Sequence, residues 1–299
     1  MKDNSNILWV GTQVGLNKYV NKKFKHYKTT GFQNNQNNVM CFAQGSKDEL
    51  FVGNWVAGIK KYNIAPDHTL RPVSSLLSAI SKDLQIWSMA KISHGSLWIG
   101  TFENGLYEYK ADKQQIINYK LDPDNIQDNQ IPVIHPVNDH NLLLGTWNGL
   151  YLFNTKTGGK IHYTHEPDNS GSLSSNKITS IITDHDKNVW IGTREGGVNI
   201  ISWNELIFKQ SPDFIHLKTH PEDEESLSNN YVNTIFQDSK NNIWIGTEGG
   251  GLNQFPYNHK HREAKFTYYT KKDGLPSNLI RGILEDKQGN LWISSGQGL

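Results

Sequence analysis

The stretch "DKNVWIGTREGGVNI", from Asp186 to Ile200, is written almost unchanged a second time as "SKNNIWIGTEGGGLN", from Ser239 to Asn253. Each copy has a polar turn, then an apolar phrase, then a glycine-rich turn and a second apolar phrase. This order is typical of antiparallel strands joined by tight turns. Because a phrase copied at this separation indicates a repeat architecture, further copies are expected elsewhere in the chain.

The centre of the phrase recurs seven times, and its fourth residue serves as an anchor for counting. The phrases are LWVGT, LFVGN, LWIGT, LLLGT, VWIGT, IWIGT and LWISS, with anchors Gly11, Gly53, Gly100, Gly145, Gly192, Gly246 and Ser294. Successive anchors are 42, 47, 45, 47, 54 and 48 residues apart. A mean period of about 47 lies within or just above the range of a four-stranded propeller blade, and a leucine-rich solenoid has a much shorter repeat.

A second position recurs fourteen residues before the second residue of the anchor phrase, as Asn37 does before Phe51. It is occupied by Asn37, Leu84, Asn129, Asn176, Asn230 and Asn278. The fixed offset predicts a rigid hairpin of two strands, A and B, with length variation confined to connections elsewhere. We expect these asparagines to bond nearby backbone where the chain turns into strand A.

Two further strands complete each unit. A glycine followed by an apolar residue opens strand C, as in "GLYEY", "GLYLF" and "GLNQF", and an apolar-aromatic stretch such as Ile116–Tyr119 supplies strand D. The sequence therefore predicts an all-β protein, a β-propeller of four-stranded antiparallel blades, with about six blades and the start of a seventh. Residues 1–299 form one propeller repeat region in this interpretation.

The repeated residue types suit a structural role. The anchor tryptophans are predicted to fill the gap between neighbouring sheets, and the glycine that follows by two positions permits close backbone approach. Trp190 and Trp244 occupy equivalent core positions in this interpretation. Cys41 falls at a strand A position that is small or medium in every unit, so we expect a packing role, not a nucleophilic or redox one.

Composition excludes several classes of function. Thirty Lys and Arg against 29 Asp and Glu leave a formal net charge of +1, so no overall field favours nucleic acid. The single cysteine excludes an internal disulfide, and no apolar run reaches the length of a membrane span. The histidines in "HLKTH" (His216–His220) and "HKH" (His259–His261) are expected at the surface, so neither a metal nor a cofactor is predicted.

Two longer segments make a family resemblance visible. "NKITSIITDHDKNVWIGTREGGVNII" (Asn176–Ile201) and "SNLIRGILEDKQGNLWISSGQGL" (Ser277–Leu299) closely resemble two-component regulator propeller repeats, as do the preceding loop phrases "SLSSN", "SLSNN" and "GLPSN". The resemblance implies the sensor region of a hybrid two-component system. Such sensors carry two seven-bladed propellers in the periplasm, a small β-sandwich domain, a membrane helix and a histidine kinase. They recognise oligosaccharides and induce genes for polysaccharide utilisation.

The resemblance also implies partners and limits. An oligosaccharide ligand, the remaining sensor domains and a second sensor protomer are the expected partners, in the periplasm. The chain shows no export signal, membrane helix or kinase segment, and its first and seventh units are incomplete in this register. Because an incomplete ring exposes sheet edges, we expect a fragment of a longer sensor, with a permuted six-bladed ring as the alternative.

Candidate ligand-binding residues follow strand B. In a propeller whose A strands are innermost, the B-to-C loops share one face with the D-to-A loops. They present Trp55, Phe102, Glu103, Trp147, Arg194, Glu195 and Glu248. Aromatic faces beside charged groups suit a carbohydrate or uronic-acid ligand, with no catalytic residue expected. A glycosidase or lyase that uses Glu103, Glu195 and Glu248 remains an alternative, as does a protein-interaction platform.

Overall fold

The computed structural model describes residues 7–12, 15–20, 23–27, 38–46, 48–67, 69–74, 77, 83–92, 95–209, 211–256 and 265–298. The chain divides into two compact units. The first comprises Met1–Leu144 with Phe153–Lys160, and the second comprises Gly145–Leu152 with Ile161–Leu299. Asn37 and the "HKH" histidines lie outside the described residues. Among the helices of the described ranges, none is both long and apolar enough to span a membrane.

The first unit consists of consecutive antiparallel sheets, each built from strands in chain order. Its sheets are β1–β2–β3, β4–β5–β6–β7 and β8–β9–β10–β11, followed by β12. The bounds are β1 Leu8–Thr12, β2 Gly15–Val20, β3 Lys23–Tyr27, β4 Val39–Gln44, β5 Glu49–Asn54, β6 Gly58–Ile64, β7 Leu70–Val73, β8 Ile86–Lys91, β9 Ser96–Thr101, β10 Leu106–Lys110, β11 Gln115–Tyr119, η2 Ile126–Asn129 and β12 Val133–Asn138.

The sheet β12–β13–β14–β15 contains the division between the units, with β13 Asn141–Thr146, β14 Gly149–Asn154 and β15 Lys160–Tyr163. The second unit continues with β16–β17–β18–β19, β20–β21–β22–β23 and β24–β25. The bounds are β16 Ile178–Thr183, β17 Asn188–Thr193, β18 Val198–Ser202, α2 Trp203–Phe208, β19 Ile215–Leu217, β20 Val232–Gln237, β21 Ile243–Thr247, β22 Leu252–Phe255, β23 Thr267–Tyr269, η4 Lys271–Asp273, β24 Ile280–Glu285 and β25 Leu291–Ser295.

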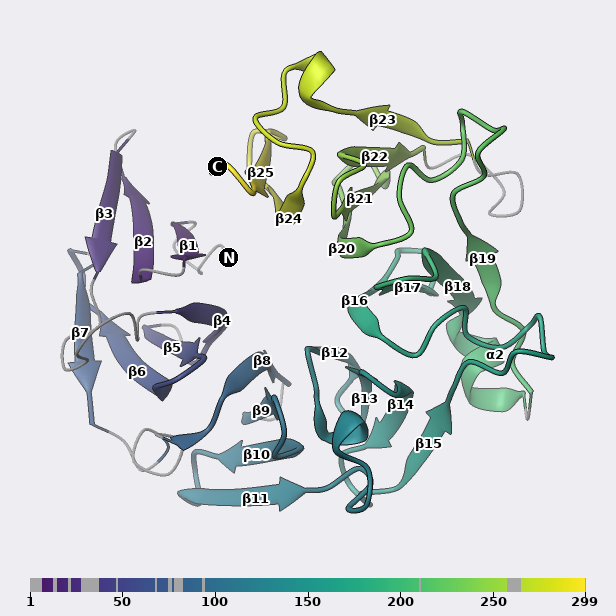
Figure 1. Cartoon of the computed structure of the whole chain (residues 1–299). Helices are drawn as coiled ribbons and strands as arrows, with labels where there is room; N and C mark the ends of the chain where they lie inside the picture. The colour runs from purple at the N-terminus through teal and green to yellow at the C-terminus, as the bar shows by residue number, and fades with distance from the viewer. Residues whose placement is uncertain are drawn as a thin grey trace. The chain divides into compact units, whose positions relative to one another are not determined.

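Within each unit, the first strands of successive sheets lie next to one another (Figure 1). β4 contacts β8 and β8 contacts β12 in the first unit, whereas β16 contacts β20 and β20 contacts β24 in the second. Side-chain bonds join these strands: Ser88 donates to the Ile131 carbonyl at 2.7 Å and Thr179 donates to the Val232 carbonyl at 2.6 Å. Four-stranded sheets stacked by their A strands are propeller blades, which confirms the predicted fold class.

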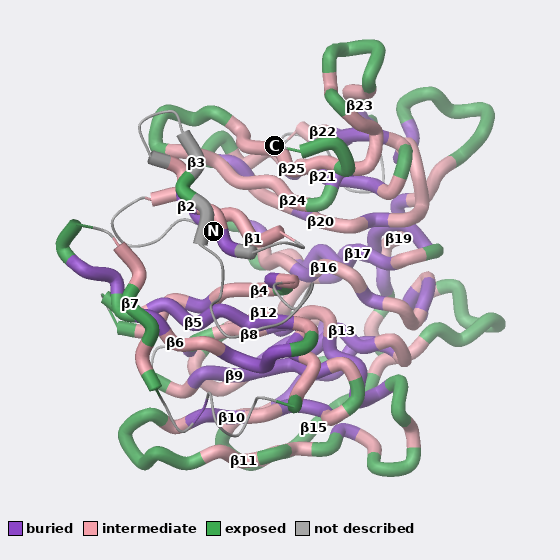
Figure 2. The backbone as a smooth tube through the Cα atoms, turned by 60° about the vertical axis from the view of Figure 1, so that its left-hand side comes forward, coloured by how far each residue is buried: buried purple, intermediate pink, exposed green. Residues whose placement is uncertain are grey.

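The B strands carry the core of each unit, as the buried colouring of β5 and β9 shows (Figure 2). Trp98 and Trp190 are almost fully buried, and each contacts a phenylalanine of the following sheet, Phe153 at 5.6 Å and Phe255 at 5.4 Å between ring centroids. The predicted gap-filling role of these tryptophans is confirmed. Trp244 occupies the equivalent place in its hairpin, opposite Phe236 as Trp190 is opposite Ile182, but it is only half-buried, so the prediction of a buried core position is not met there.

The anchor glycines lie where a neighbouring strand leaves no room for a side chain. A Cβ at Gly192 would come within 2.7 Å of Val232, and one at Gly246 within 2.6 Å of Ile280. The interpretation of these glycines as sites of close approach is confirmed, although side chains of the next A strand supply the closest atoms. Cys41 packs against Gly53, and burial raises the pKa of its thiol, as expected for a filler.

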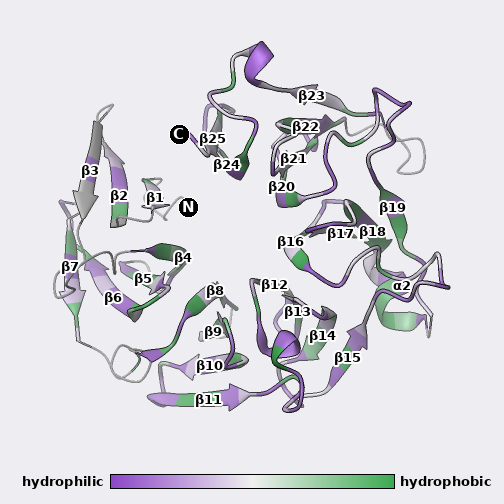
Figure 3. Ribbon diagram, in the orientation of Figure 1, coloured by the Kyte–Doolittle hydropathy of each residue, from purple (hydrophilic) through white to green (hydrophobic). Residues whose placement is uncertain are grey.

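Two features of the fold lie outside the sequence prediction. The A strands β4, β8, β16, β20 and β24 each have a register shift near their start, for example between Ile178 and Ser180 and between Val232 and Thr234. The short helix α2 follows β18, buries Leu206, and adds length between strands C and D. The interval of 54 residues between the anchors Gly192 and Gly246 is long because of this C-to-D connection. Variation in the length of the connections was expected, but the helix was not. Figure 3 shows hydrophobic colour on α2, in contrast to the hydrophilic turn η4.

Candidate functional site

The candidate residues stand on a repeated backbone scaffold. In four sheets, the residue that follows the anchor threonine or asparagine donates its N–H to a carbonyl just before strand A of the same sheet. The pairs are Trp55 to Asn38 at 3.1 Å, Phe102 to Gln85 at 3.0 Å, Arg194 to Lys177 at 2.9 Å and Glu248 to Tyr231 at 3.0 Å. Each loop therefore starts in the same way, while the side chain that it presents changes from sheet to sheet.

The anchor threonine closes the loop that follows it. Thr193 donates its hydroxyl to the Gly197 carbonyl at 2.9 Å and accepts the Gly196 N–H at 2.9 Å. Thr247 makes the same pair of bonds with Gly251 and Gly250, both at 3.0 Å. The recurrence of threonine at the end of the anchor phrase could have indicated this role, which the sequence analysis did not assign.

The asparagines of the second recurring position bond backbone, as expected. The Oδ1 atom of Asn230 accepts the Thr219 N–H at 2.8 Å, and its carbonyl accepts the Gly197 N–H at 3.0 Å. Asn278 repeats both bonds with Lys271 and Gly251. One residue thereby joins the exit of strand D to the B-to-C loop of the preceding sheet, because its side chain and its main chain bond to different segments.

In the first unit, Trp55 and Phe102 meet in an aromatic cluster. Their ring centroids are 4.8 Å apart, and Trp87 of β8 contacts both, at 5.8 Å from Trp55 and 5.2 Å from Phe102. All three side chains are half-buried. Glu103 is exposed beside the cluster, and its carbonyl accepts a bond from Lys120 at 3.3 Å. The three rings form a partly accessible apolar surface of the kind that stacks on sugar rings.

In the second unit, Arg194 lies between two aromatic rings. Its guanidinium carbon is 5.7 Å from the ring centroid of Trp147 and 5.3 Å from that of Tyr231, distances at which a cation is attracted to a ring face. All three side chains are half-buried. The loops that follow β13 and β17 supply Trp147 and Arg194, whereas Tyr231 precedes β20.

The carboxylates of the second unit have their own partners. Glu195 pairs with Lys177 at 2.9 Å, and both are exposed. Glu248 accepts a bond from Asn233 at 2.8 Å and lies 3.5 Å from Arg281. Asn233 also donates to the Ile280 carbonyl at 3.0 Å, which fixes its amide. The predicted residues of this unit therefore belong to one charged and aromatic surface, defined by Trp147, Lys177, Arg194, Glu195, Tyr231, Asn233, Glu248 and Arg281.

Trp87 and Tyr231 were not predicted. Both belong to or precede strand A, which the sequence analysis treated as packing. Each A strand has a small or medium-sized residue at one position, such as Ser88 or Thr234. The signal that was missed is that the residue type varies among sheets one residue and three residues before that position. The first of these positions holds Trp87, Thr179, Asn233 and Arg281, and the second holds Gln85, Lys177, Tyr231 and Leu279.

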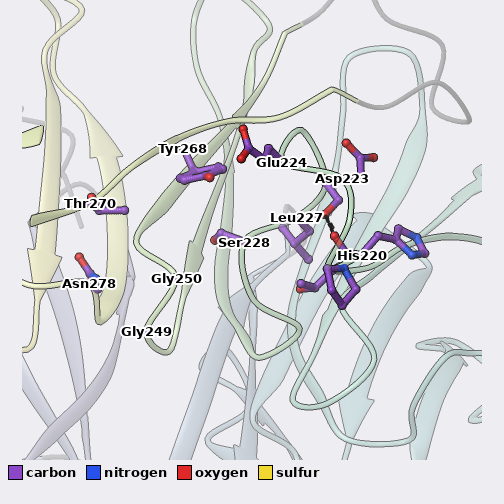
Figure 4. A pocket seen from close by; sticks show the side chains of 13 residues that line it. His220, Asp223, Glu224, Leu227, Ser228, Gly249, Gly250, Tyr268, Thr270 and Asn278 are labelled. Carbon is purple, nitrogen blue, oxygen red and sulfur yellow. Dashed lines mark hydrogen bonds between the residues drawn. The ribbon is translucent and has the colours of Figure 1, made fainter. Parts of the chain in front are cut away.

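A hollow of about 340 Å³ lies close to this surface in the second unit (Figure 4). The D-to-A segment from Thr219 to Ser228 lines it, with Gly249, Gly250, Tyr268, Thr270 and Asn278. Asp223 and Glu224 bring carboxylates to it, and Tyr268 is 41% exposed. This hollow was not predicted from the sequence. The D-to-A loops of the two sheets share a hydrogen bond: Ser172 accepts from the Glu166 N–H and Ser226 accepts from the His220 N–H, both at 2.9 Å.

The histidines of "HLKTH" have contacts within the protein. His216 bonds the Ser172 carbonyl at 2.7 Å, and burial lowers the pKa of its imidazole. A smaller hollow of about 210 Å³ is lined by His216, His220 and Phe266. In the described part of the chain, no three His, Cys, Asp or Glu residues gather closely enough to hold a metal ion.

The blades and their stacking define the chain as a β-propeller protein. Residues 172–195, 226–249 and 274–297 match the two-component regulator propeller family, so the chain carries repeats of that family, as the resemblance predicted. Histidine kinase P4 of Formosa agariphila is 29% identical over 220 residues, which is 72% of this chain and 16% of the kinase. The chain thus corresponds to a small part of that relative.

Solved structures share the fold. PorZ, a surface component of the type-IX secretion system of Porphyromonas gingivalis, superposes with a TM-score of 0.70 at 17% identity, over 98% of this chain and 44% of PorZ. A structure described as the extracellular domain of a hybrid two-component system from B. thetaiotaomicron gives 0.52 at 20% identity, over 99% of this chain and 49% of that domain. At these identities the likeness establishes the fold.

Proposed function

We propose that this chain is the ligand-sensing region of a two-component sensor and that its ligand is an oligosaccharide. The observation that carries the proposal is the scaffold described above. Four B-to-C loops start with the same backbone bond, yet present tryptophan (Trp55), phenylalanine (Phe102), arginine (Arg194) or glutamate (Glu248). A structural requirement would repeat one residue type, as it does for the anchor glycine and threonine. Selective recognition requires different side chains at positions that the backbone holds in the same way.

The chemistry of these side chains supports a sugar ligand. The rings of Trp55, Trp87 and Phe102 offer apolar faces, and the charged and amide groups of the second unit offer donors and acceptors for hydroxyl groups. In the proposed role, binding occurs in the periplasm, and further sensor domains or a second protomer transmit it to a kinase that controls polysaccharide-utilisation genes. The repeats and the kinase relative support this placement.

The carboxylate partners favour binding over turnover. A glycosidase needs one carboxylic acid and one carboxylate flanking the scissile bond. Glu195 and Glu248 instead each pair with a cation of the protein, Lys177 and Arg281, so neither is a carboxyl group held free for a sugar. We therefore favour a non-catalytic region. A protein-interaction platform remains the second alternative, and it predicts no affinity for free sugars.

Calorimetric titration tests the proposal. The chain is titrated with oligosaccharides prepared from pectin, xylan, mannan and carrageenan, and the recovered sugars are examined by mass spectrometry. We expect one class to bind and to be recovered intact. Trp55→Ala and Trp147→Ala should identify the contacting loop by weakening that binding about tenfold or more. Phe208→Ala is the control, because Phe208 is a 79% exposed aromatic residue of α2. Cleaved sugar would support an enzyme, and the absence of any binding would contradict the proposal.

A further inference from the structure

Arg194 has an unusual environment for a cation. Its side chain is half-buried and contacts both Trp147 and Tyr231, with the guanidinium carbon 5.7 Å and 5.3 Å from the two ring centroids. Among the residues that the structure describes, none accepts a hydrogen bond from this guanidinium or forms an ion pair with it. Its N–H donors are therefore available to a ligand, although the group has lost part of its contact with water.

The other charged residues that define this surface pair with one another and not with Arg194. Lys177 is paired with Glu195 at 2.9 Å, and Arg281 with Glu248 at 3.5 Å. The same Oε2 atom of Glu248 also accepts a hydrogen bond from the amide of Asn233 at 2.8 Å. These two pairs are neutral in sum, so the surface as a whole retains the positive charge of Arg194. Any ligand carrying negative charge gains attraction here, and it gains more as water is excluded.

The surrounding structure holds the guanidinium in place. Arg194 donates its N–H to the Lys177 carbonyl at 2.9 Å. Tyr231 is fixed at both ends of its peptide, since its N–H donates to Asn229 at 2.7 Å and its carbonyl accepts from Glu248 at 3.0 Å. Aromatic contacts engage the faces of a guanidinium and leave its edge for hydrogen bonds. A positioned edge with two parallel donors matches a carboxylate or a sulfate group, and prior positioning lowers the entropy lost on binding.

We propose that Arg194 binds the anionic group of the ligand, so that this sensor selects oligosaccharides bearing carboxylate or sulfate over neutral ones. The inference rests on the proposed sugar-sensing function and names the substrate class of that same surface. Trp147 and Tyr231 position the guanidinium, and Arg194 supplies the charge and the paired donors. Carboxylate from a uronic acid and sulfate from a sulfate ester present the same pair of oxygens, so the experiment separates the two sources.

The test compares three trisaccharides by calorimetric titration of the full 299-residue chain. Trigalacturonate carries carboxylates, its carboxyl-reduced counterpart is neutral, and a sulfated galactose trisaccharide carries sulfates. We expect one acidic probe to bind at least about tenfold more tightly than the neutral one, because a charge-assisted bidentate bond is lost without the anion. The preferred acidic probe identifies the source of the anion. Its affinity should fall as salt rises, because ions screen the attraction.

Variants locate the effect. Arg194→Lys keeps the charge but removes the fork of donors, and Arg194→Gln removes both, so each should lower the affinity for the preferred acidic probe by about tenfold or more. Lys240→Gln is the matched control, since it removes one exposed positive charge at the opposite end of the β20–β21 hairpin from Tyr231 and Glu248. It should leave affinity unchanged, with circular dichroism confirming the fold of each variant.

The outcomes distinguish this inference from the proposed function. Equal affinity of the wild-type chain for acidic and neutral probes would overturn the selection of anions and leave sugar sensing in place; this comparison needs no variant. Unchanged affinity of folded Arg194→Lys and Arg194→Gln would overturn the role of Arg194. Failure of the wild-type chain to bind any of these probes or any sugar of the wider panel would overturn both.

Discussion

Single residues of this chain divide into those that repeat and those that vary at equivalent positions. Gly192 and Gly246 repeat because a neighbouring strand fills the space of a side chain. Thr193 and Thr247 repeat because their hydroxyl groups close the following loop. The next residue is Arg194 in one sheet and Glu248 in the other, on the same backbone bond. Repetition thus marks packing and loop closure, and variation marks the surface that a ligand can read.

The anchor tryptophans provide a residue-scale prediction about stability. Trp190 is 1% exposed, contacts Phe255 at 5.4 Å and donates to Asp184 at 2.8 Å, whereas Trp244 makes the equivalent bond to Asp238 at 2.8 Å but is only half-buried. We expect Trp190→Ala to lower the free energy of unfolding by about 3 to 5 kcal/mol, because it leaves a cavity and removes one of the hydrogen bonds to the Asp184 carboxylate. The loss for Trp244→Ala should be clearly smaller, because fewer buried contacts disappear.

Chemical denaturation monitored by far-ultraviolet circular dichroism measures both losses. Ile161→Ala is a suitable control, since Ile161 is a 50% exposed apolar residue of β15. Equal losses for the two tryptophan variants would show that exposure does not distinguish them, and the original equivalence drawn from the sequence would then hold for energetics.

The sequence predicted individual residues well where they follow a repeated phrase. It predicted them less well where a site is formed by residues from several segments. The loop residues Trp55, Phe102, Trp147 and Arg194 could be named because they follow a recognisable anchor. Trp87 and Tyr231, which contact them, could not, since strand A alternates between core and surface and a register shift changes which residues face outward. Contacts between different sheets are long-range and leave no spacing to read.

At the scale of elements, the A–B hairpin is organised by an aspartate that the sequence analysis passed over. Asp238 accepts the N–H groups of Lys240 and Asn242, the amide of Asn242 and the indole N–H of Trp244. Asp286 repeats the arrangement with Gln288, Asn290 and Trp292. One carboxylate therefore fixes both the turn and the ring at the start of strand B.

These hairpins predict a loss of stability in acid. Bonds from Asn290 lower the pKa of Asp286 to about 2, and although burial opposes it, bonds from Asn242 and Trp244 lower the pKa of Asp238. An unfolded aspartate titrates near about 3.9. A carboxyl group with a depressed folded pKa stabilises the fold fully above its unfolded pKa, and the stabilisation disappears as the pH falls through the folded pKa. The chain should lose stability between about pH 5 and pH 2, in part through Asp238 and Asp286.

Urea denaturation at a series of pH values measures this effect. Asp238→Asn and Asp286→Asn should be less stable than wild type at pH 6, and the difference should shrink toward pH 2, as the wild-type carboxyl groups become protonated. Asp112→Asn, in the exposed turn after β10, serves as the control. A difference that stays constant over the whole pH range would show that these carboxylates do not act through their charge.

Elements themselves were largely predictable, because strand alternation, turn residues and a fixed offset are local properties. The predicted strands C and D correspond to β10 and β11, β14 and β15, and β22 and β23. The helix α2 was missed: "WNELIF" is only six residues long, too short for helical periodicity to be read, and its cap is the single hydroxyl of Ser202.

At the scale of the whole molecule, the candidate surface of the first unit is aromatic, whereas that of the second combines aromatic rings with charged groups. The first gathers the rings of Trp55, Trp87 and Phe102, and the second gathers charges around Arg194. A sensor and an enzyme built on this scaffold would differ in what happens to the ligand after binding. A sensor retains it unchanged, so the bound state persists, whereas an enzyme converts it and releases products.

Thermal unfolding distinguishes these two outcomes for the complete chain. A ligand that binds only the folded state at one hundred times its dissociation constant adds about 2.7 kcal/mol of stability. For a chain of this size, such a gain should raise the melting temperature by about 5 °C or more. We expect the oligosaccharide that binds in calorimetry to produce this increase, and prolonged incubation before heating to leave it undiminished. A shift that decays with incubation, while smaller sugars accumulate, would favour the glycosidase or lyase. No shift with the ligand identified by calorimetry would contradict specific binding to the native fold.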